Sequence, residues 1–275
     1  MKVNNFTQRT LTGALFVIIV VGAIVLHPFV FGVLFLVVTI LGLTEFYRLI
    51  RAGGHQPGLV SGLAGSILLY GLVFFVANGF LSAKMLSVLW LIIPLVAITE
   101  LFSGNARPFA NIGSTLLGVI YVAVPFSVLN CLYGPWREPR EPAYAFLLGY
   151  FVILWLNDTG AYLTGKSAGK HLLFRRISPK KTWEGIAGGL AAGMLTAWVL
   201  SRFFKQLAPG EWLILAVLVI MFSTFGDLVE SMLKRSVDVK DSGTLLPGHG
   251  GILDRFDGVL LSAPAVYLYV YLVLN

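Results

Sequence analysis

Long apolar stretches separated by short polar segments dominate this chain. The apolar windows cover residues 11–26, 29–50, 59–80, 85–102, 109–132, 144–163, 183–203, 211–233 and 258–274. The segments between them carry helix-ending glycine and proline together with charge, for example at 51–54 and 134–139. Since roughly twenty apolar residues span the hydrocarbon core of a bilayer, the pattern predicts about nine transmembrane helices. The expected fold class is an all-α, polytopic integral membrane protein.

Composition supports a membrane domain and argues against a soluble module. The 275 residues are 57% hydrophobic and 12% charged, whereas charged residues make up roughly 25% of an ordinary soluble domain. A water-soluble fold of this size would have too few charges to cover its surface. We therefore expect residues 1–275 to form a single membrane domain.

The basic residues indicate how the chain is oriented. If the N-terminus is cytoplasmic, all but five of the 20 Lys and Arg residues fall on the cytoplasmic side. The exceptions are Lys84, Arg137, Arg140, Arg202 and Lys205. This bias is the one that the positive-inside rule requires, and it places the C-terminus on the far side. Much of the charge lies in 166–181 and 234–255, so we expect anionic partners at the inner leaflet and no nucleic acid.

Several polar residues interrupt the apolar windows. An Asp at the centre of a spanning helix costs roughly 3 kcal/mol on insertion scales, so such residues are functional candidates. Asn157 and Asp158 interrupt one window, and Asp227 with Glu230 interrupts another. Helical spacing places Ser223, Asp227, Glu230 and Lys234 on one stripe. The alternative is a structural role in interhelical hydrogen bonds, with Glu230 and Lys234 satisfying one another.

Two further acidic residues have a simpler interpretation. Glu45 and Glu100 lie near predicted cytoplasmic ends of windows, with Arg48 and Arg107 respectively within reach. We expect both carboxylates to lie at the membrane interface.

The segment 231–258 holds the densest set of charged residues. It reads SMLKRSVDVKDSGTLLPGHGGILDRFDG, and it combines four basic residues with Asp238, Asp241, Asp254 and Asp257. Carboxylates that hold Mg²⁺, together with Lys and Arg, suit a nucleoside triphosphate. Gly250 and Gly251, beside His249, would let backbone amides approach phosphate. Asp254 and Asp257 are three residues apart at the mouth of the last helix, and Asp227 could complete a metal site with them.

This segment resembles the signature of phosphatidate cytidylyltransferases, also called CDP-diacylglycerol synthases. Every specified position of that signature is present, and the matching residues are Ser231, Leu233, Lys234, Arg235, Lys240, Asp241, Gly243, Leu246, Pro247, His249, Gly250, Gly251, Ile252, Asp254, Arg255, Phe256 and Asp257. The segments 157–162 and 177–185 look like further motifs of that family. The resemblance therefore covers roughly residues 157–258, and residues 1–143 hold helices of unassigned role.

The resemblance implies transfer of a cytidylyl group from CTP to phosphatidic acid, giving CDP-diacylglycerol and pyrophosphate, with Mg²⁺ required. The helices and loops of 144–275 would be catalytic. We expect Asp227, Asp254 and Asp257 to hold one or two metal ions, and Lys181, Lys234 and Arg255 to clamp phosphates. The expected substrate-binding residues are Asn157, Asp158, Lys180, Lys181, Arg235, Lys240, Asp241, His249, Gly250 and Gly251. His249 has two interpretations, as a phosphate donor or as a loop-ordering hydrogen-bond partner. The resemblance also implies a homodimer, and a bacterial inner membrane is the expected location.

Two neighbouring segments need separate interpretation. Residues 160–167 read GAYLTGKS and satisfy the P-loop pattern, but they close an apolar window instead of following a short strand, so we reject a P-loop. Residues 178–184 are interpreted as a loop entering a helix, with Ser178 or Thr182 as its cap. Lys180 and Lys181 would then lie at a helix N-terminus, which favours anions. The alternative for this segment is a plain anchor at the lipid headgroups.

Other function classes remain open at this point. A secondary transporter also uses intramembrane carboxylates, but it needs no dense cytoplasmic loop, and no repeated halves are evident. Nearer rivals are a polyprenol-type lipid kinase that uses CTP and a cytidylyltransferase acting on an isoprenoid lipid phosphate. The sequence separates these poorly, and a product assay would distinguish them.

Overall fold

The computed structural model describes residues 5–133, 142–243 and 250–274. Within these ranges, eight helices are long and apolar enough to cross a membrane. The first predicted window corresponds to α1 (Asn5–Leu26), whose apolar segment Thr12–Leu26 is shorter. The prediction of an all-α polytopic membrane protein is confirmed, with one short hairpin as the described β-structure.

The chain divides into two compact units. Unit 1 contains residues 1–131 and 233–256, and unit 2 contains residues 132–232 and 257–275. Helices α9 (Pro209–Ser236) and α10 (Leu253–Tyr269) each contribute residues to both units.

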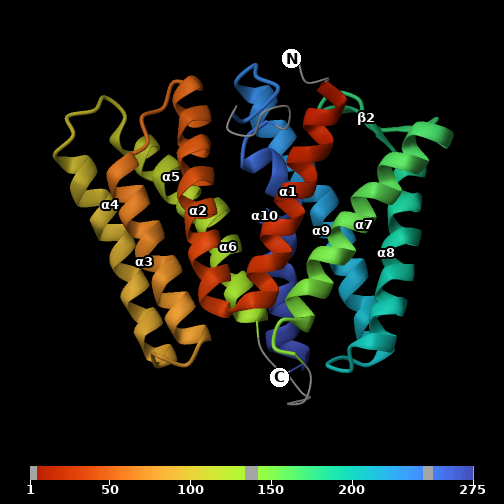
Figure 1. The fold of residues 1–275 in the computed structure, drawn as a ribbon. Helices are drawn as coiled ribbons and strands as arrows, with labels where there is room; N and C mark the ends of the chain where they lie inside the picture. Colours follow the sequence, from red (N-terminus) through yellow and green to blue (C-terminus); the bar gives the residue numbers. More distant parts are fainter. Residues whose placement is uncertain (1–4, 134–141, 244–249, 275) are drawn as a thin grey trace. The chain divides into compact units, whose positions relative to one another are not determined.

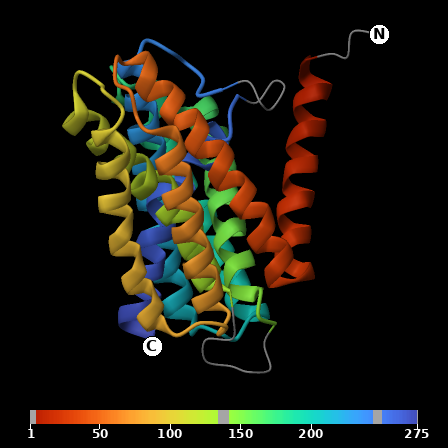
Figure 2. The same cartoon turned by 90° about the vertical axis from the view of Figure 1, so that its left-hand side faces the viewer.

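Unit 1 consists of the N-terminal helices and residues 233–256 of the signature segment (Figure 1). After α1, its elements are α2 (Pro28–Ala52), α3 (Leu59–Ala77), the 3₁₀ helix η1 (Ala83–Leu91), α4 (Ile92–Leu101), α5 (Pro108–Gly118), the π-helical segment η2 (Val119–Ala123), α6 (Val124–Val128) and the 3₁₀ turn η3 (Leu129–Leu132). Helices α1 and α2 meet at the turn around His27 and diverge away from it (Figure 2).

A buried aromatic cluster forms part of the core of unit 1. The Phe35 ring centroid lies 5.5 Å from that of Phe256 and 6.0 Å from that of Phe126. Phe126 and Phe256 are themselves 5.4 Å apart, edge to face, a geometry that aromatic rings prefer. Phe256 belongs to the signature, so this cluster anchors the first turn of α10 against α2 and α6.

Unit 2 is built on a close pair of helices, α7 (Ala145–Ala168) and α8 (Trp183–Phe203), with α9 and most of α10 (Figure 1). It ends with the π-helical segment η4 (Val270–Leu274). Gly185, Gly189 and Gly193 recur every four residues along α8 and are all buried. A Cβ at position 189 would lie 2.5 Å from the Asn157 Oδ1 atom and 3.0 Å from its carbonyl oxygen. Small residues therefore let the two helix backbones approach closely, as is common in membrane helix pairs.

A short antiparallel hairpin joins α7 to α8. Strand β1 (Leu172–Phe174) pairs with β2 (Ser178–Thr182), with Leu172 opposite Thr182 and Phe174 opposite Ser178. The prediction that residues 178–182 form a loop is therefore wrong, because these residues pair with β1. The prediction of a Thr182 cap is confirmed, since its side chain accepts a hydrogen bond of 3.1 Å from the Gly185 amide.

The rejection of a P-loop at residues 160–167 is confirmed. These residues lie inside α7, which runs as one helix from Ala145 to Ala168. A P-loop instead follows a strand and wraps its backbone amides around phosphate before a helix begins. Amides within this helix point along its axis to backbone carbonyls, so they cannot form such a phosphate nest.

Candidate functional site

Unit 2 contains an ion pair between the hairpin and α9. The ammonium group of Lys181, the penultimate residue of β2, contacts the Asp227 Oδ2 atom. The Asp227 Oδ1 atom accepts a hydrogen bond of 3.1 Å from the Ser231 hydroxyl, one turn later on α9. The side chains of Lys181 and Asp227 are 27% and 32% exposed, so the pair is reachable from outside the helices. The structure thus brings together two predicted site residues that are far apart in sequence.

Helix α7 adds Asn157 and Asp158 to this group. Asn157 is buried, and its amide nitrogen donates a hydrogen bond of 3.2 Å to the Asp158 carboxylate. Asp158 interacts electrostatically with both Lys181 and Asp227. The glycine stripe on α8 explains this arrangement, because bulkier residues at 189 would push Asn157 away.

Helix α10 brings a third carboxylate. A Cβ at position 226 would overlap the carbonyl oxygen of Asp257, and one at position 258 would lie 3.1 Å from the Ser223 Cβ atom. The glycines at 226 and 258 therefore allow α9 and α10 to pack closely at the level of Asp257. Asp257 interacts electrostatically with Asp227, Glu230 and Asp158. We call Asp158, Lys181, Asp227 and Asp257 the carboxylate cluster.

The carboxylate cluster has the chemistry that a divalent cation requires, because hard oxygen donors suit Mg²⁺. The cluster holds three carboxylates and one lysine, which contacts Asp227 and interacts with Asp158, so negative charge remains for a cation to neutralise. Within the described ranges, however, no three His, Cys, Asp or Glu side chains are close enough together to form a preformed metal cage. The donor types fit Mg²⁺, and the geometry for it is not preassembled.

Unit 1 contains a second group, centred on Asp254 in the first turn of α10. Its Oδ1 atom accepts a bond of 2.6 Å from the Lys234 ammonium group. Its Oδ2 atom accepts from the Ser242 amide at 2.9 Å, the Ser242 hydroxyl at 3.0 Å and the Gly251 amide at 2.7 Å. Both side chains of the ion pair are nearly buried, with 11% of Asp254 and 12% of Lys234 exposed. Asp254 therefore connects Lys234, Ser242 and Gly251, three separate parts of the signature segment.

Asp254 and Asp227 belong to different units, so their predicted shared metal site stays a prediction. The four donors around Asp254 are an observation that the sequence did not predict. A metal ion at this carboxylate would have to replace at least one of them.

Glu45 is a further carboxylate of this region, and its contacts here were not predicted from the sequence. It lies on α2 and is 5% exposed, so it is buried within the protein, and its predicted position at the membrane interface stays a prediction. Its Oε1 atom accepts a hydrogen bond of 3.0 Å from the Ile252 amide. Its Oε2 atom accepts from the Leu253 amide and the Ser242 hydroxyl, both at 3.1 Å. The signal available in the sequence was a carboxylate inside an apolar window.

The remaining predicted site residues are less tightly held. The Arg235 guanidinium donates to the Val239 carbonyl at 3.2 Å, in the turn that follows α9. Lys180, Lys240 and Asp241 are exposed, and Arg255 is half-buried on α10. Gly250 has a φ of +80°, in the left-handed region that favours glycine. His249 lies outside the described residues, so both of its interpretations stay predictions.

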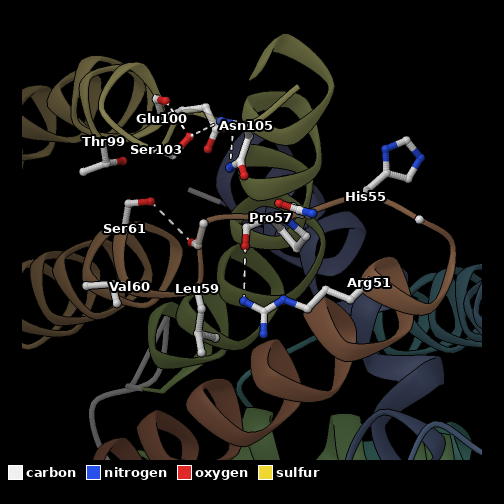
Figure 3. A pocket seen from close by; sticks show the side chains of 13 residues that line it. Arg51, His55, Pro57, Leu59, Val60, Ser61, Thr99, Glu100, Ser103 and Asn105 are labelled. Atoms are coloured by element: carbon white, nitrogen blue, oxygen red, sulfur yellow. Dashed lines mark hydrogen bonds between the residues drawn. The ribbon is translucent and has the colours of Figure 1, made fainter. Parts of the chain in front are cut away.

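Glu100 is also buried within the protein, and its predicted position at the membrane interface stays a prediction. It is 6% exposed, and its Oε1 atom accepts hydrogen bonds from the side-chain amides of Asn105 at 3.0 Å and Asn111 at 2.8 Å. It lines a pocket of about 830 Å³ in unit 1, where Arg51 donates to the Pro57 carbonyl (Figure 3). None of the predicted site residues that the structure describes lines this pocket.

Comparison with known proteins gives a consistent result over almost the whole chain. The profile of the cytidylyltransferase family matches residues 7–273. A Bacillus subtilis protein named phosphatidate cytidylyltransferase is 35% identical over 275 residues, covering 98% of each chain. Proteins of the same name from Staphylococcus epidermidis and Mycobacterium bovis are 39% and 31% identical, covering 76% and 93% of this chain and 76% and 85% of their own.

Proposed function

We propose, since this chain belongs to the cytidylyltransferase family, that it transfers the cytidylyl group of CTP to phosphatidic acid, giving CDP-diacylglycerol and pyrophosphate. The observation that carries the proposal is the extent of the similarity. It covers the N-terminal helices as well as the signature, and the relatives that match over most of their length share one name. The chain is thus an integral membrane enzyme of phospholipid biosynthesis.

The reaction needs little acid–base chemistry from the protein. A phosphate monoester is largely deprotonated at neutral pH, so its oxygen can attack the α-phosphorus of CTP directly. A new phosphorus–oxygen bond forms while the bond to the departing pyrophosphate breaks. The protein must therefore align the two phosphates and neutralise their charge.

Basic residues of this chain supply the charge neutralisation in our proposal. Lys181 and Lys234 each approach a carboxylate, which holds the ammonium group at a defined position. Arg255 follows Asp254 on α10 and would contact a phosphate beside Lys234. Lys180, Arg235 and Lys240 are exposed and would bind the outer phosphates of CTP.

We propose that Mg²⁺ binds the carboxylate cluster, with Asp227 and Asp257 as ligands and Asp158 with Asn157 lining a second metal position. The cation would neutralise the triphosphate and the leaving pyrophosphate. A bound phosphate group would compete with Asp227 for the Lys181 ammonium group. Asp254 stays a proposed Mg²⁺ ligand, and a cation there would have to displace one of its four hydrogen-bond donors.

Orientation, location and assembly belong to the same proposal. The bias in the basic residues supports an N-terminus in the cytoplasm and a catalytic face at the inner leaflet. Bacterial relatives support a bacterial membrane as the location, and we propose that it is the inner (cytoplasmic) membrane. The proposed assembly is a homodimer. Crosslinking in native membranes should therefore yield a dimer, and cysteines placed near Lys181 should react only from the cytoplasmic side.

The defining experiment is a product assay with purified protein in detergent, phosphatidic acid and CTP labelled in the cytosine ring. We expect labelled CDP-lipid and free pyrophosphate in the presence of Mg²⁺, and no product in EDTA until Mg²⁺ is restored. Release of labelled CDP together with a phosphorylated lipid would instead identify a kinase. An isoprenoid phosphate that reacts faster than phosphatidic acid would identify the other rival. Turnover that persists in EDTA would refute the metal requirement.

A further inference from the structure

We propose that Glu45 is a positioning residue for cytidylyl transfer, acting on Lys234 through Ser242 and Asp254. This inference rests on the proposed function for its catalytic consequence, although its structural part can be tested without turnover. It gives one of the N-terminal helices a role in the reaction.

The first step is the cost of burying Glu45. An ionised carboxylate removed from solvent is destabilising unless it is paired or hydrogen-bonded. Among the described residues, Glu45 forms no ion pair. Its compensation comes instead from the Ile252 and Leu253 amides and the Ser242 hydroxyl. The carboxylate therefore depends on the signature segment as much as that segment depends on it.

The second step is the location of those amides. Helix α10 begins at Leu253, so the two amides belong to its N-terminus. The first amides of a helix have no intrahelical acceptor, and the helix dipole favours an anion there. A local Ser, Thr, Asp or Asn usually fills this role. Here the acceptor comes from α2, about 200 residues earlier in the chain.

The third step concerns two signature glycines. A Cβ at position 251 would overlap the Glu45 Oε2 atom and the Ser242 hydroxyl. A Cβ at position 243 would lie 2.6 Å from the Glu45 Oε1 atom, closer than real Cβ contacts. Gly243 and Gly251 therefore leave space for the carboxylate, and for Gly251 this is a different requirement from the approach to phosphate that the sequence suggested.

The fourth step links Glu45 to the Lys234–Asp254 ion pair. The Ser242 hydroxyl lies 3.1 Å from the Glu45 Oε2 atom and 3.0 Å from the Asp254 Oδ2 atom. A hydroxyl has a single hydrogen to donate, so the two carboxylates share one donor. The strength of the bond to one carboxylate depends on the bond to the other. Asp254 in turn holds the Lys234 ammonium at 2.6 Å. Loss of the Glu45 charge thus changes the position of Lys234.

The test is Glu45→Gln, which keeps the size of the side chain and removes its charge. We expect kcat to fall by about tenfold to a hundredfold, the effect of a small misplacement of a reacting group. The KM for CTP should change by less than about threefold, since the lost interaction acts mainly in the transition state. Amide exchange at Ile252 and Leu253 should become faster while exchange elsewhere is unchanged.

Glu211→Gln is the matched control. Glu211 also accepts a hydrogen bond near a helix N-terminus, from the Ala208 amide at 2.8 Å before α9. We expect this variant to keep wild-type turnover and wild-type exchange at residues 252 and 253. A loss of activity equal to that of Glu45→Gln would show that any lost cap is harmful, and it would overturn the specific role of Glu45.

Ser242→Ala provides a second measurement if Glu45→Gln does not fold. This variant removes the shared hydroxyl and leaves the bonds from Glu45 to the backbone. We expect a smaller kcat loss, and the double variant should lose less than the sum of the two single losses in free energy, because both variants disturb the same Ser242 hydroxyl. Wild-type kcat in Ser242→Ala, strictly additive losses, or unchanged exchange in Glu45→Gln would each overturn the inference. A wild-type protein without cytidylyl transfer would refute the proposed function and leave the exchange result to test Glu45.

Discussion

The substitution Asp254→Asn distinguishes two roles for this carboxylate. The amide has the same shape as the carboxylate, but only one of its two terminal atoms accepts hydrogen bonds. If the amide nitrogen replaces Oδ2, it faces the Ser242 and Gly251 donors. If it replaces Oδ1, it faces the Lys234 ammonium. The second orientation is less costly, because it sacrifices one contact instead of three.

The magnitude follows from that single contact. A hydrogen bond to a charged group is worth about 1.5–3 kcal/mol, and the pair is nearly buried, so solvent screens it little. Each 1.4 kcal/mol changes a rate by about tenfold. If Asp254 only positions Lys234, kcat should fall by about 10- to 100-fold. If Asp254 also binds metal, the loss should exceed about 1,000-fold, since metal-stabilised charge is lost as well.

The assay is initial-rate CDP-lipid formation over a range of Mg²⁺ concentrations, with expression and thermal stability measured alongside. A metal ligand predicts a raised Mg²⁺ requirement, whereas a positioning role predicts an unchanged one. Asp238→Asn is the control, because Asp238 is exposed in the same segment and its φ of +54° is tolerated by Asn. Activity within twofold of wild type for Asp254→Asn would refute both roles.

Two further predictions concern unit 2. Lys181→Met should lower kcat by at least tenfold in the product assay, because Asp227 loses its ammonium partner and the phosphates lose a cation; an unchanged rate would remove Lys181 from the site. Gly189→Ala should lower the melting temperature in detergent, since its Cβ would lie 2.5 Å from the Asn157 Oδ1 atom and overpacking costs about 1–3 kcal/mol. Gly71→Ala is the matched control, because nothing lies within 4 Å of its added Cβ, and equal melting temperatures for the two variants would contradict the packing argument.

The helices were predictable because their apolar windows are local and long. Every window corresponds to helical structure, although 85–102 begins as the 3₁₀ helix η1 and 109–132 is interrupted by the π-helical segment η2. The predicted start of the last window lies too far toward the C-terminus. Helix α10 begins at Leu253, before the window at 258, because its first five residues include the charged residues Asp254, Arg255 and Asp257. Hydropathy alone does not detect a polar first turn.

The site was partly predictable. Charged residues in apolar windows identified Asp158 and Asp227, and the structure places both beside Lys181. Contacts between distant segments were not predictable from one sequence. Nothing near Glu45 indicates that its acceptor atoms serve amides about 200 residues away. The β2 strand was missed for a similar reason, since a lysine-rich segment of five residues becomes a strand only through pairing with β1.

The glycine repeat on α8 does not by itself fix the alignment of that helix with α7. A slide of four residues, about 6 Å along the axis, would bring one glycine of the repeat to the place of the next. The hairpin removes this ambiguity because it is a spacer of fixed length, and Glu184 reinforces it by accepting from the Lys170 and His171 amides at 3.1 and 3.2 Å. Lengthening the hairpin by a few residues would therefore allow α8 to shift along α7. Lys181 would then move past Asp227, while both helices stay intact.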